Sequence, residues 1–128
     1  MTNQELIKRA EEMKPVAYVP YSNFPVGAAL LSEDGTVFTG CNVENSAYSM
    51  CICAERTALV KAVSEGHQKF QKIAVTADTE EYCLPCGACR QMLIEFAPDM
   101  DVLCANKDGD YVSYKLHDML APAFQLKK

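Results

Sequence analysis

Two predicted helices that begin at cysteine-bearing segments constrain this chain more than any other feature of its sequence. One helix is expected over 53–65 and starts at Cys53, and the other is expected over 86–96 and starts at Cys86. Cys86 and Cys89 are three residues apart, so both sulfurs can point to one place from a single helix start. A helix N-terminus also lowers the pKa of a thiol and so favours the thiolate that metal ions bind. A fold that brings the two helix starts together would build a metal site from separate parts of the chain.

Short apolar strands alternate with these helices and predict an α/β layered domain with a mixed sheet. The expected strands cover 26–31, 37–41, 73–77, 102–105 and 111–114. The Asp34-Gly35 step between the first two strands predicts a hairpin. A first helix is expected over 3–17, with Thr2 or Asn3 as its N-cap. No linker or internal repeat is visible, so we expect a single domain over residues 1–128.

The charge balance limits the classes of partner. The net charge is −5, and no run of Lys and Arg is present. Nucleic-acid binders usually carry a basic face, so we expect a small, nearly neutral substrate and no nucleic-acid partner. The first residues lack the apolar core of a signal peptide, and no apolar run approaches the length of a membrane span. The sequence therefore predicts a cytoplasmic protein with no membrane partner.

The seven cysteines would stay reduced in the cytoplasm, which favours metal binding or burial over disulfides. Cys53, Cys86 and Cys89 can supply three zinc ligands and leave the fourth tetrahedral position open, which is typical of catalytic zinc. Glu55 follows Cys53 by two residues and is placed to flank that open position as a proton carrier. We therefore expect one Zn²⁺ per chain.

The charge of this ligand set opposes its chemistry. Three thiolates and Zn²⁺ sum to one negative charge, which works against forming hydroxide at the metal. Arg56 is three residues after Cys53, hence on the same helical face, and could hydrogen-bond its sulfur. Gln91 or Arg90 could do the same beside Cys89. We predict that Arg56 tunes the metal electrostatically.

Spacing alone leaves a noncatalytic site open. Together with Cys83, the same cysteines could close a structural four-sulfur zinc module. The run from Cys83 to Cys89 is also similar to part of an iron–sulfur ligand set, but the expected fourth Cys-Pro is missing. The Cys53-x-Glu55 element favours catalytic zinc over both alternatives.

These segments match the signature of zinc nucleoside deaminases, in which His or Cys-x-Glu is followed by Pro-Cys-x-x-Cys. Nearly the whole chain resembles the small homotetrameric cytidine deaminases of the cytidine/deoxycytidylate deaminase superfamily. The resemblance runs through residues 17–30, 40–45, 53–58 and 85–91. It implies a three-layer α/β/α fold with a five-stranded mixed sheet.

The resemblance also implies a reaction, namely hydrolytic deamination of cytidine and deoxycytidine in pyrimidine salvage, with release of ammonia. A zinc-activated hydroxide would attack C4 of the base while Glu55 shuttles protons. The implied substrate-binding residues are Phe24 at the pyrimidine ring, Asn42 and Glu44 at the ribose 3′ hydroxyl, the Ala54 N–H at the base carbonyl, and Tyr48 and Phe124 in a neighbouring subunit's pocket. Such sharing implies a homotetramer. Leu84, whose backbone carbonyl would accept from the substrate amino group, stands where relatives more often carry Ser or Thr.

Two other deaminase classes fit less well. Deaminases of cytosine-containing nucleoside antibiotics share the zinc and proton-shuttle motifs but are less faithful to the segments at 24–30 and 42–45. A nucleic-acid deaminase conflicts with the acidic balance of the chain.

Overall fold

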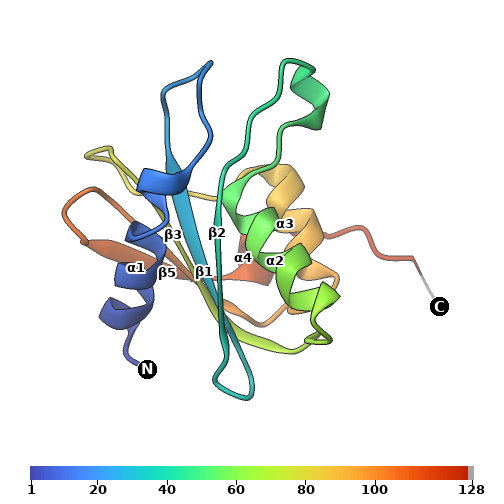
Figure 1. The fold of residues 1–128 in the computed structure, drawn as a ribbon. Coiled ribbons are helices and arrows are strands. Elements are labelled where there is room, and N and C mark those ends of the chain that lie inside the picture. The colour runs from blue at the N-terminus through green and yellow to red at the C-terminus, as the bar shows by residue number, and fades with distance from the viewer. Residues whose placement is uncertain (127–128) are drawn as a thin grey trace.

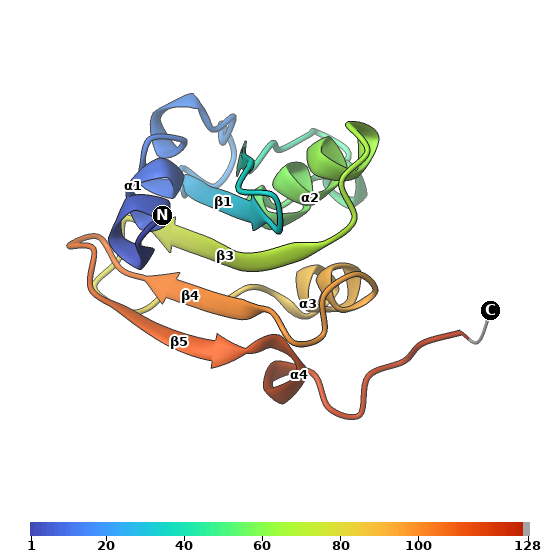
Figure 2. The same ribbon diagram turned by 90° about the horizontal axis from the view of Figure 1, so that it is seen from below.

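A five-stranded mixed sheet forms the centre of the structure, a computed structural model that describes residues 1–126 (Figure 1). The strands are β1 (Val26–Ser32), β2 (Val37–Cys41), β3 (Phe70–Ala77), β4 (Asp101–Ala105) and β5 (Tyr111–Lys115). Their spatial order is β2-β1-β3-β4-β5, so β3 lies between β1 and β4 (Figure 2). The β3–β4 pair is parallel and every other neighbouring pair is antiparallel. The predicted mixed sheet of five strands is confirmed.

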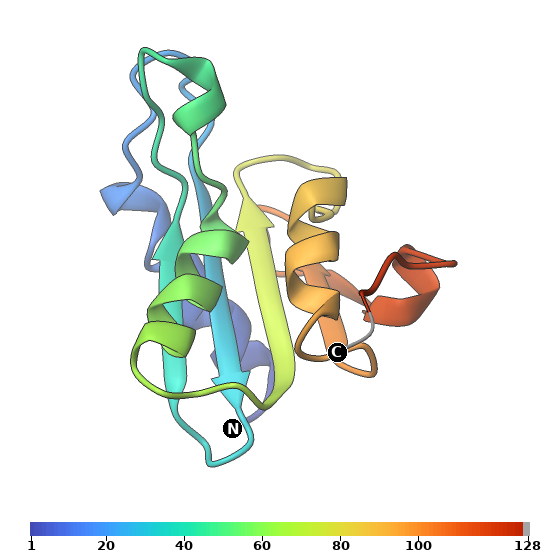
Figure 3. The ribbon, with the colours of Figure 1, turned by 90° about the vertical axis from the view of Figure 1, so that its right-hand side faces the viewer.

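Helices cover both faces of the sheet and complete three layers. One face carries α1 (Asn3–Glu11), and the other carries α2 (Ala54–Ser64) and α3 (Gly87–Ile94), with the short α4 (Leu116–Met119) beside α3. Figure 3 shows α2 and α3 in front of the sheet and α1 behind it. Two 3₁₀ turns, η1 (Lys14–Val16) and η2 (Tyr48–Met50), lie in the connecting segments. Within residues 1–126, every helix is too short or too polar to cross a bilayer.

Alternate residues of the central strands divide the core into two clusters. On β4, Val102 and Cys104 belong to the cluster under α2 and α3, whereas Leu103 and Ala105 belong to the cluster under α1. This period of two follows from the pleat, because successive side chains point to opposite faces of a sheet. A strand buried on both faces is apolar throughout, which explains the unbroken apolar runs in the sequence.

Two strand glycines allow the helices to approach the sheet closely. A Cβ atom on Gly27 would lie 1.9 Å from the Ala10 carbonyl oxygen of α1. A Cβ atom on Gly40 would lie 2.4 Å from the Ala54 carbonyl oxygen of α2. Both contacts are with helix backbone, which can give way only if the helix moves. Gly40 therefore sets the position of the first turn of α2.

The N-terminal helix is shorter than predicted, ending at Glu11 rather than near residue 17. Pro15 lies in η1, where the chain has already left the α-helical path, because proline lacks the N–H that a helix interior requires. Thr2 is the N-cap: its hydroxyl accepts from the Glu5 N–H at 3.1 Å, and the Glu5 carboxylate accepts from the Thr2 N–H at 2.9 Å. The four-residue α4 was not predicted, since one turn is too short to show a helical period.

Candidate functional site

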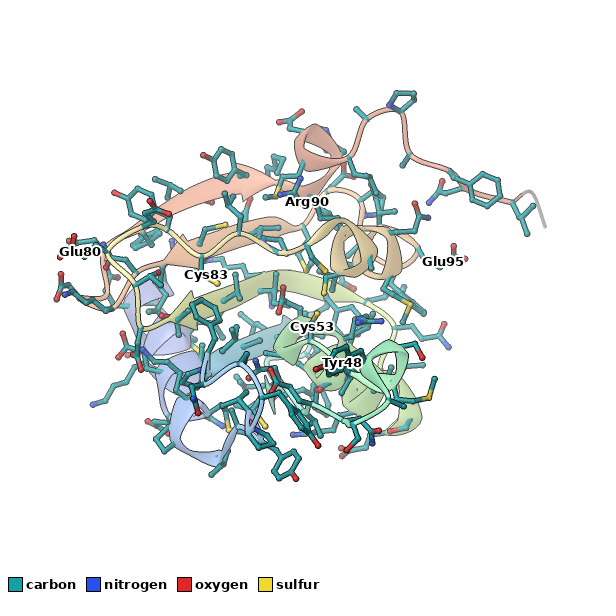
Figure 4. The ribbon with its side chains drawn as sticks, turned by 90° about the horizontal axis from the view of Figure 1, so that it is seen from above. Tyr48, Cys53, Glu80, Cys83, Arg90 and Glu95 are labelled. Carbon is teal, nitrogen blue, oxygen red and sulfur yellow. The ribbon has the colours of Figure 1, made fainter. Side chains whose placement is uncertain are left out.

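Three cysteine sulfurs meet where α2 and α3 begin. Cys53 is the N-cap of α2, Cys86 is the N-cap of α3, and Cys89 lies in the first turn of α3. Figure 4 shows Cys53 at the start of α2, on the side that faces α3. The Sγ atoms of Cys53 and Cys86 are 3.8 Å apart, those of Cys86 and Cys89 are 3.2 Å apart, and all three lie within 4.8 Å of one another. The structure thus brings together the cysteines that the sequence singled out.

The sulfur positions suit a single zinc ion. Tetrahedral zinc with thiolate ligands at about 2.3 Å places two sulfurs about 3.8 Å apart. The separations of 3.8 and 3.2 Å are close to that value. Thiolates are soft ligands that select zinc over hard cations such as magnesium. Three protein ligands also leave one coordination position free, which catalytic zinc requires.

The thiol of Cys53 is the acidic member of the cluster. Hydrogen bonding with Cys89 and with the Arg56 guanidinium lowers the pKa of Cys53 to about 5. Hydrogen bonding to Cys53 and burial raise the pKa of Cys89. Arg56 Nη2 lies 3.6 Å from Cys53 Sγ and 3.5 Å from the Cys51 carbonyl oxygen. A cation therefore contacts the cluster at the place that its spacing from Cys53 predicts, although its effect on the metal stays a prediction.

Glu55 lies in the first turn of α2 with only 4% of its surface exposed. Burial in this position raises the pKa of its carboxyl to about 7, and the nearby Cys53 charge adds to the shift. A carboxyl group whose pKa lies near neutrality can both accept a proton and return it. The position of Glu55 beside Cys53 fits the role of proton carrier.

A cavity of about 160 Å³ opens beside the cluster. Its wall comes from four separate segments, and the lining residues are Phe24, Val26, Asn42, Cys53, Ala54, Glu55, Cys83, Leu84 and Cys86. Apolar walls with a few convergent polar groups are typical of small-molecule sites. A larger hollow of about 400 Å³, around Asp34 and His67, lies at the opposite end of the strands. In the described part of the chain the only metal-binding cluster is beside the smaller cavity, so we take that cavity as the functional one.

Phe24 and Asn42 lie together at the cavity and are hydrogen-bonded to each other. Asn42 Nδ2 donates to the Phe24 carbonyl oxygen at 2.8 Å, and Asn42 Oδ1 accepts from the Val26 N–H at 2.9 Å. Asn42 therefore fixes the backbone that carries the Phe24 ring. Ala54 is the first residue of α2, so its backbone N–H has no partner within the helix and is free to bind a ligand at the cavity wall.

Two other predicted residues hold loops and do not line the cavity. The Glu44 carboxylate accepts hydrogen bonds from the backbone N–H groups of Tyr21 and Ser22, each at 3.1 Å. Gln91 Nε2 donates to the Phe124 carbonyl oxygen at 2.8 Å, not to a cluster sulfur. The loop that Glu44 holds at Tyr21 and Ser22 also carries Phe24, which lines the cavity.

Tyr48 and Phe124 are strongly exposed, at 75% and 67% of their surface. Tyr48 lies in η2 and packs edge-to-face on Tyr21, with ring centroids 6.2 Å apart. Neither ring lines the cavity of its own chain. The structure therefore does not bring these two residues to the site within one subunit.

Cys83 stays apart from the metal-binding cluster. Its sulfur is not among the three that converge, and it packs against the core under α3. Burial raises the pKa of Cys83 to about 12, which disfavours the thiolate that a metal would need. The structural four-cysteine alternative is therefore not formed. Cys83 and Val26 are cavity-lining residues that sequence reasoning missed, because Cys83 was considered only as a fourth zinc ligand and Val26 only as part of a buried strand.

The chain is similar to known deaminases both in sequence and in fold. The family model for the cytidine and deoxycytidylate deaminase zinc-binding region matches residues 1–105. A cytidine deaminase of Sporosarcina psychrophila is 53% identical over 125 residues, covering 97% of this chain and 92% of that protein. A cytidine deaminase of Halalkalibacterium halodurans is 50% identical, with 97% and 95% coverage. The crystal structure of cytidine deaminase from Burkholderia pseudomallei matches with a TM-score of 0.94 and 48% identity, over 97% of this chain and 100% of that one.

Proposed function

The chain belongs to the zinc-binding cytidine and deoxycytidylate deaminase family of hydrolases, and on that premise we propose that it converts cytidine and deoxycytidine to uridine and deoxyuridine. The observation that carries the proposal is the cavity in which the cysteine cluster, Glu55 and Phe24 meet. A zinc ion bound by Cys53, Cys86 and Cys89 would supply Lewis-acid activation of water at neutral pH. The proposal assigns the reaction to pyrimidine salvage in the cytoplasm.

Glu55 is the proton carrier in this proposal. It takes a proton from the attacking water and delivers it to ring N3, which makes C4 more electrophilic. A C4–O bond forms as the C4=N3 double bond becomes single, and Glu55 then carries the proton of the new C4 hydroxyl to the amino group. The C4–N bond breaks and ammonia leaves. The burial of Glu55 supports this role, because a carboxyl shielded from bulk water exchanges its proton with the substrate.

The remaining cavity residues would select a nucleoside. Phe24 would pack against the pyrimidine ring, and the Ala54 N–H would donate to the base carbonyl. Asn42 and Glu44 would bind the 3′ hydroxyl, a contact that free cytosine cannot make, so free cytosine should be a poor substrate. The Glu44 charge would also repel the phosphate of a nucleotide. The positions of Phe24, Asn42 and Ala54 on one cavity wall support this assignment.

We further propose a homotetramer in which Tyr48 and Phe124 complete the pocket of a neighbouring subunit. Both aromatic rings are exposed and lie away from the cavity of their own chain. Large exposed aromatic side chains are enriched where protein surfaces meet. The assembly is read directly from the molar mass in solution by light scattering.

The test uses protein purified without added metal. Conversion of cytidine to uridine is followed by absorbance and by ammonia release, and zinc is quantified on the same sample. About one zinc per chain together with turnover supports the proposal. Free cytosine and cytidine monophosphate serve as controls and should react poorly. Tight zinc binding without turnover of cytidine or deoxycytidine would contradict the proposal and favour a deaminase of modified cytosine nucleosides.

A further inference from the structure

We propose that Ser22 is a positioning residue whose hydroxyl holds Phe24 at the cavity. The inference rests on the proposed function, because it concerns the wall that would contact the pyrimidine ring. Ser22 lies in the segment 17–25, which rises beside the segment 42–53 at one end of the sheet (Figures 1 and 3). Hydrogen bonds place Ser22 between Phe24 and Glu44, two residues of the proposed substrate site.

The Ser22 hydroxyl bonds both Glu44 and Phe24. It donates to Glu44 Oε2 and accepts from the Phe24 backbone N–H at 3.1 Å. A hydroxyl has one proton and two lone pairs, so donation to the carboxylate leaves a lone pair for the Phe24 N–H. Hydrogen bonding from Ser22 lowers the pKa of Glu44 and so keeps the carboxylate ionised. Donation to an ionised carboxylate polarises the hydroxyl and strengthens its second hydrogen bond.

Side chains hold the Phe24 backbone on both sides. Its N–H is bonded to Ser22 Oγ at 3.1 Å, and its carbonyl oxygen is bonded to Asn42 Nδ2 at 2.8 Å. When both flanking peptide groups are fixed, the direction of the Cα–Cβ bond is fixed as well. Phe24 is 45% exposed, so packing alone does little to orient its ring. The two hydrogen bonds therefore fix the backbone from which the Phe24 ring projects.

The local turn makes the Ser22–Phe24 bond possible. Asn23 lies between the two residues with φ of 54°, in the left-handed region that asparagine tolerates better than most residues. Its N–H donates to the Val19 carbonyl oxygen at 3.0 Å. In such a turn a serine hydroxyl can accept from the backbone two residues on. Since Glu44 also accepts the Ser22 N–H at 3.1 Å, both the backbone and the side chain of Ser22 are anchored.

The first test measures KM and kcat for cytidine. Ser22→Ala is expected to raise KM on the order of tenfold, the effect of losing one hydrogen bond to a charged group, and to change kcat by less than about twofold. Ser22→Thr keeps a hydroxyl and should restore KM. Ser46→Ala is the matched control, because it removes a hydroxyl that bonds the Tyr21 hydroxyl at 2.6 Å between the same two segments. The control should leave KM unchanged. An unchanged KM in Ser22→Ala would overturn the inference.

A double-mutant cycle tests whether Ser22 acts through Phe24. In a Phe24→Ala background, Ser22→Ala should change KM by less than about twofold, because the ring that it positions is gone. The full increase in KM in that background would show that Ser22 acts through Glu44 alone, and the inference would fall.

The amide NMR signal of Phe24 reads the contact without any assay of activity. Ser22→Ala should shift this signal and speed its hydrogen exchange, since the N–H loses its acceptor. An unmoved signal would overturn the inference whatever the kinetics. If the unaltered chain fails to turn over cytidine while the signal still shifts in Ser22→Ala, the proposed function is wrong and the positioning of Phe24 by Ser22 stands.

Discussion

The first turns of α1 and α2 both place a glutamate close behind the N-cap residue, Glu5 three residues after Thr2 and Glu55 two residues after Cys53, but use it differently. In α1 the two side chains bond the free backbone N–H groups and form a capping box at the surface. In α2 the Cys53 side chain caps nothing, and Glu55 is buried beside the cluster.

The start of α3 resembles that of α2 more than that of α1. Its N-cap, Cys86, accepts only a 3.4 Å contact from the Cys89 N–H, and sulfur is a weak acceptor. The capping hydrogen bonds are therefore well formed at α1, absent at the Cys53 side chain and weak at the Cys86 side chain. Proteins tend to break local rules for helix starts at functional sites. α1 therefore stabilises the fold, whereas the starts of α2 and α3 carry the proposed metal site.

Replacing Glu55 or Glu5 by glutamine should have very different effects on turnover. Glu55→Gln should lower kcat by about 10²- to 10⁴-fold, the usual contribution of a general acid–base group. Zinc content and melting temperature should be retained, because the amide has the same shape. Glu5→Gln is the matched control and should leave kcat unchanged, since glutamine also serves in a capping box. The kcat of both variants is measured by steady-state kinetics. If the kcat of Glu55→Gln stayed within tenfold of the wild-type value, a difference of about 1.4 kcal/mol in the activation barrier, Glu55 would not be the proton carrier.

Cys86→Ser tests whether Cys86 serves to bind the metal or to cap α3. Serine is a good N-cap, so the metal-free protein should keep its free energy of unfolding or gain less than about 1 kcal/mol. Zinc content and turnover should both be lost. Cys41→Ser is the control, because Cys41 contacts the Val16 carbonyl oxygen and no cluster sulfur. Retention of zinc by Cys86→Ser, measured by metal analysis, would remove Cys86 from the ligand set.

Gly27→Ala and Gly40→Ala extend the comparison to the packing of the two helices. Each added methyl would collide with helix backbone, so each variant should lose about 1–3 kcal/mol of unfolding free energy. Only Gly40→Ala should also weaken zinc binding, because it displaces the turn that carries Cys53. Zinc titration of the folded variants with a metal indicator measures the difference. Equal zinc affinity in both variants would mean that the cluster does not depend on the position of α2.

Thr2→Ala should give the smallest effect. Loss of the N-cap hydroxyl should lower the free energy of unfolding by about 1 kcal/mol, with kcat and zinc content unchanged. Gln4→Ala changes an exposed neighbour in the same turn and serves as the control. Urea denaturation followed by circular dichroism measures both. A fall in zinc content in Thr2→Ala would show that α1 contributes to the site after all.

Sequence patterns predicted the framework because they act locally. The strand over 37–41 has the predicted bounds, since the alternation of side chains and the Asp34-Gly35 turn define it within a few residues. The cysteine cluster followed from helical spacing at Cys86 and Cys89 and from the matching helix start at Cys53. Chemistry that depends on neighbours along a helix can be recognised before the fold is known.

Other parts of the site depend on contacts between distant segments, which spacing does not reveal. The cavity wall at Val26 and Cys83 forms only when the sheet brings the two segments together. The bond from Gln91 to the Phe124 carbonyl joins residues 33 positions apart, and no local pattern predicts it. The link from Glu44 through Ser22 to Phe24 likewise required the two loops to be side by side.

The approach of Cys53 to Cys86 has a consequence for chain entropy. The two sulfurs are separated by 33 positions in sequence, and closing a loop of that length in a disordered chain costs about 4 kcal/mol. Within that loop β3 pairs with β1 on one side and with β4 on the other, so the sheet already restrains the middle of the loop. A metal that binds here does not have to close the loop itself. We therefore expect the metal-free chain to keep its fold, unlike small zinc-organised domains, which need the metal to fold.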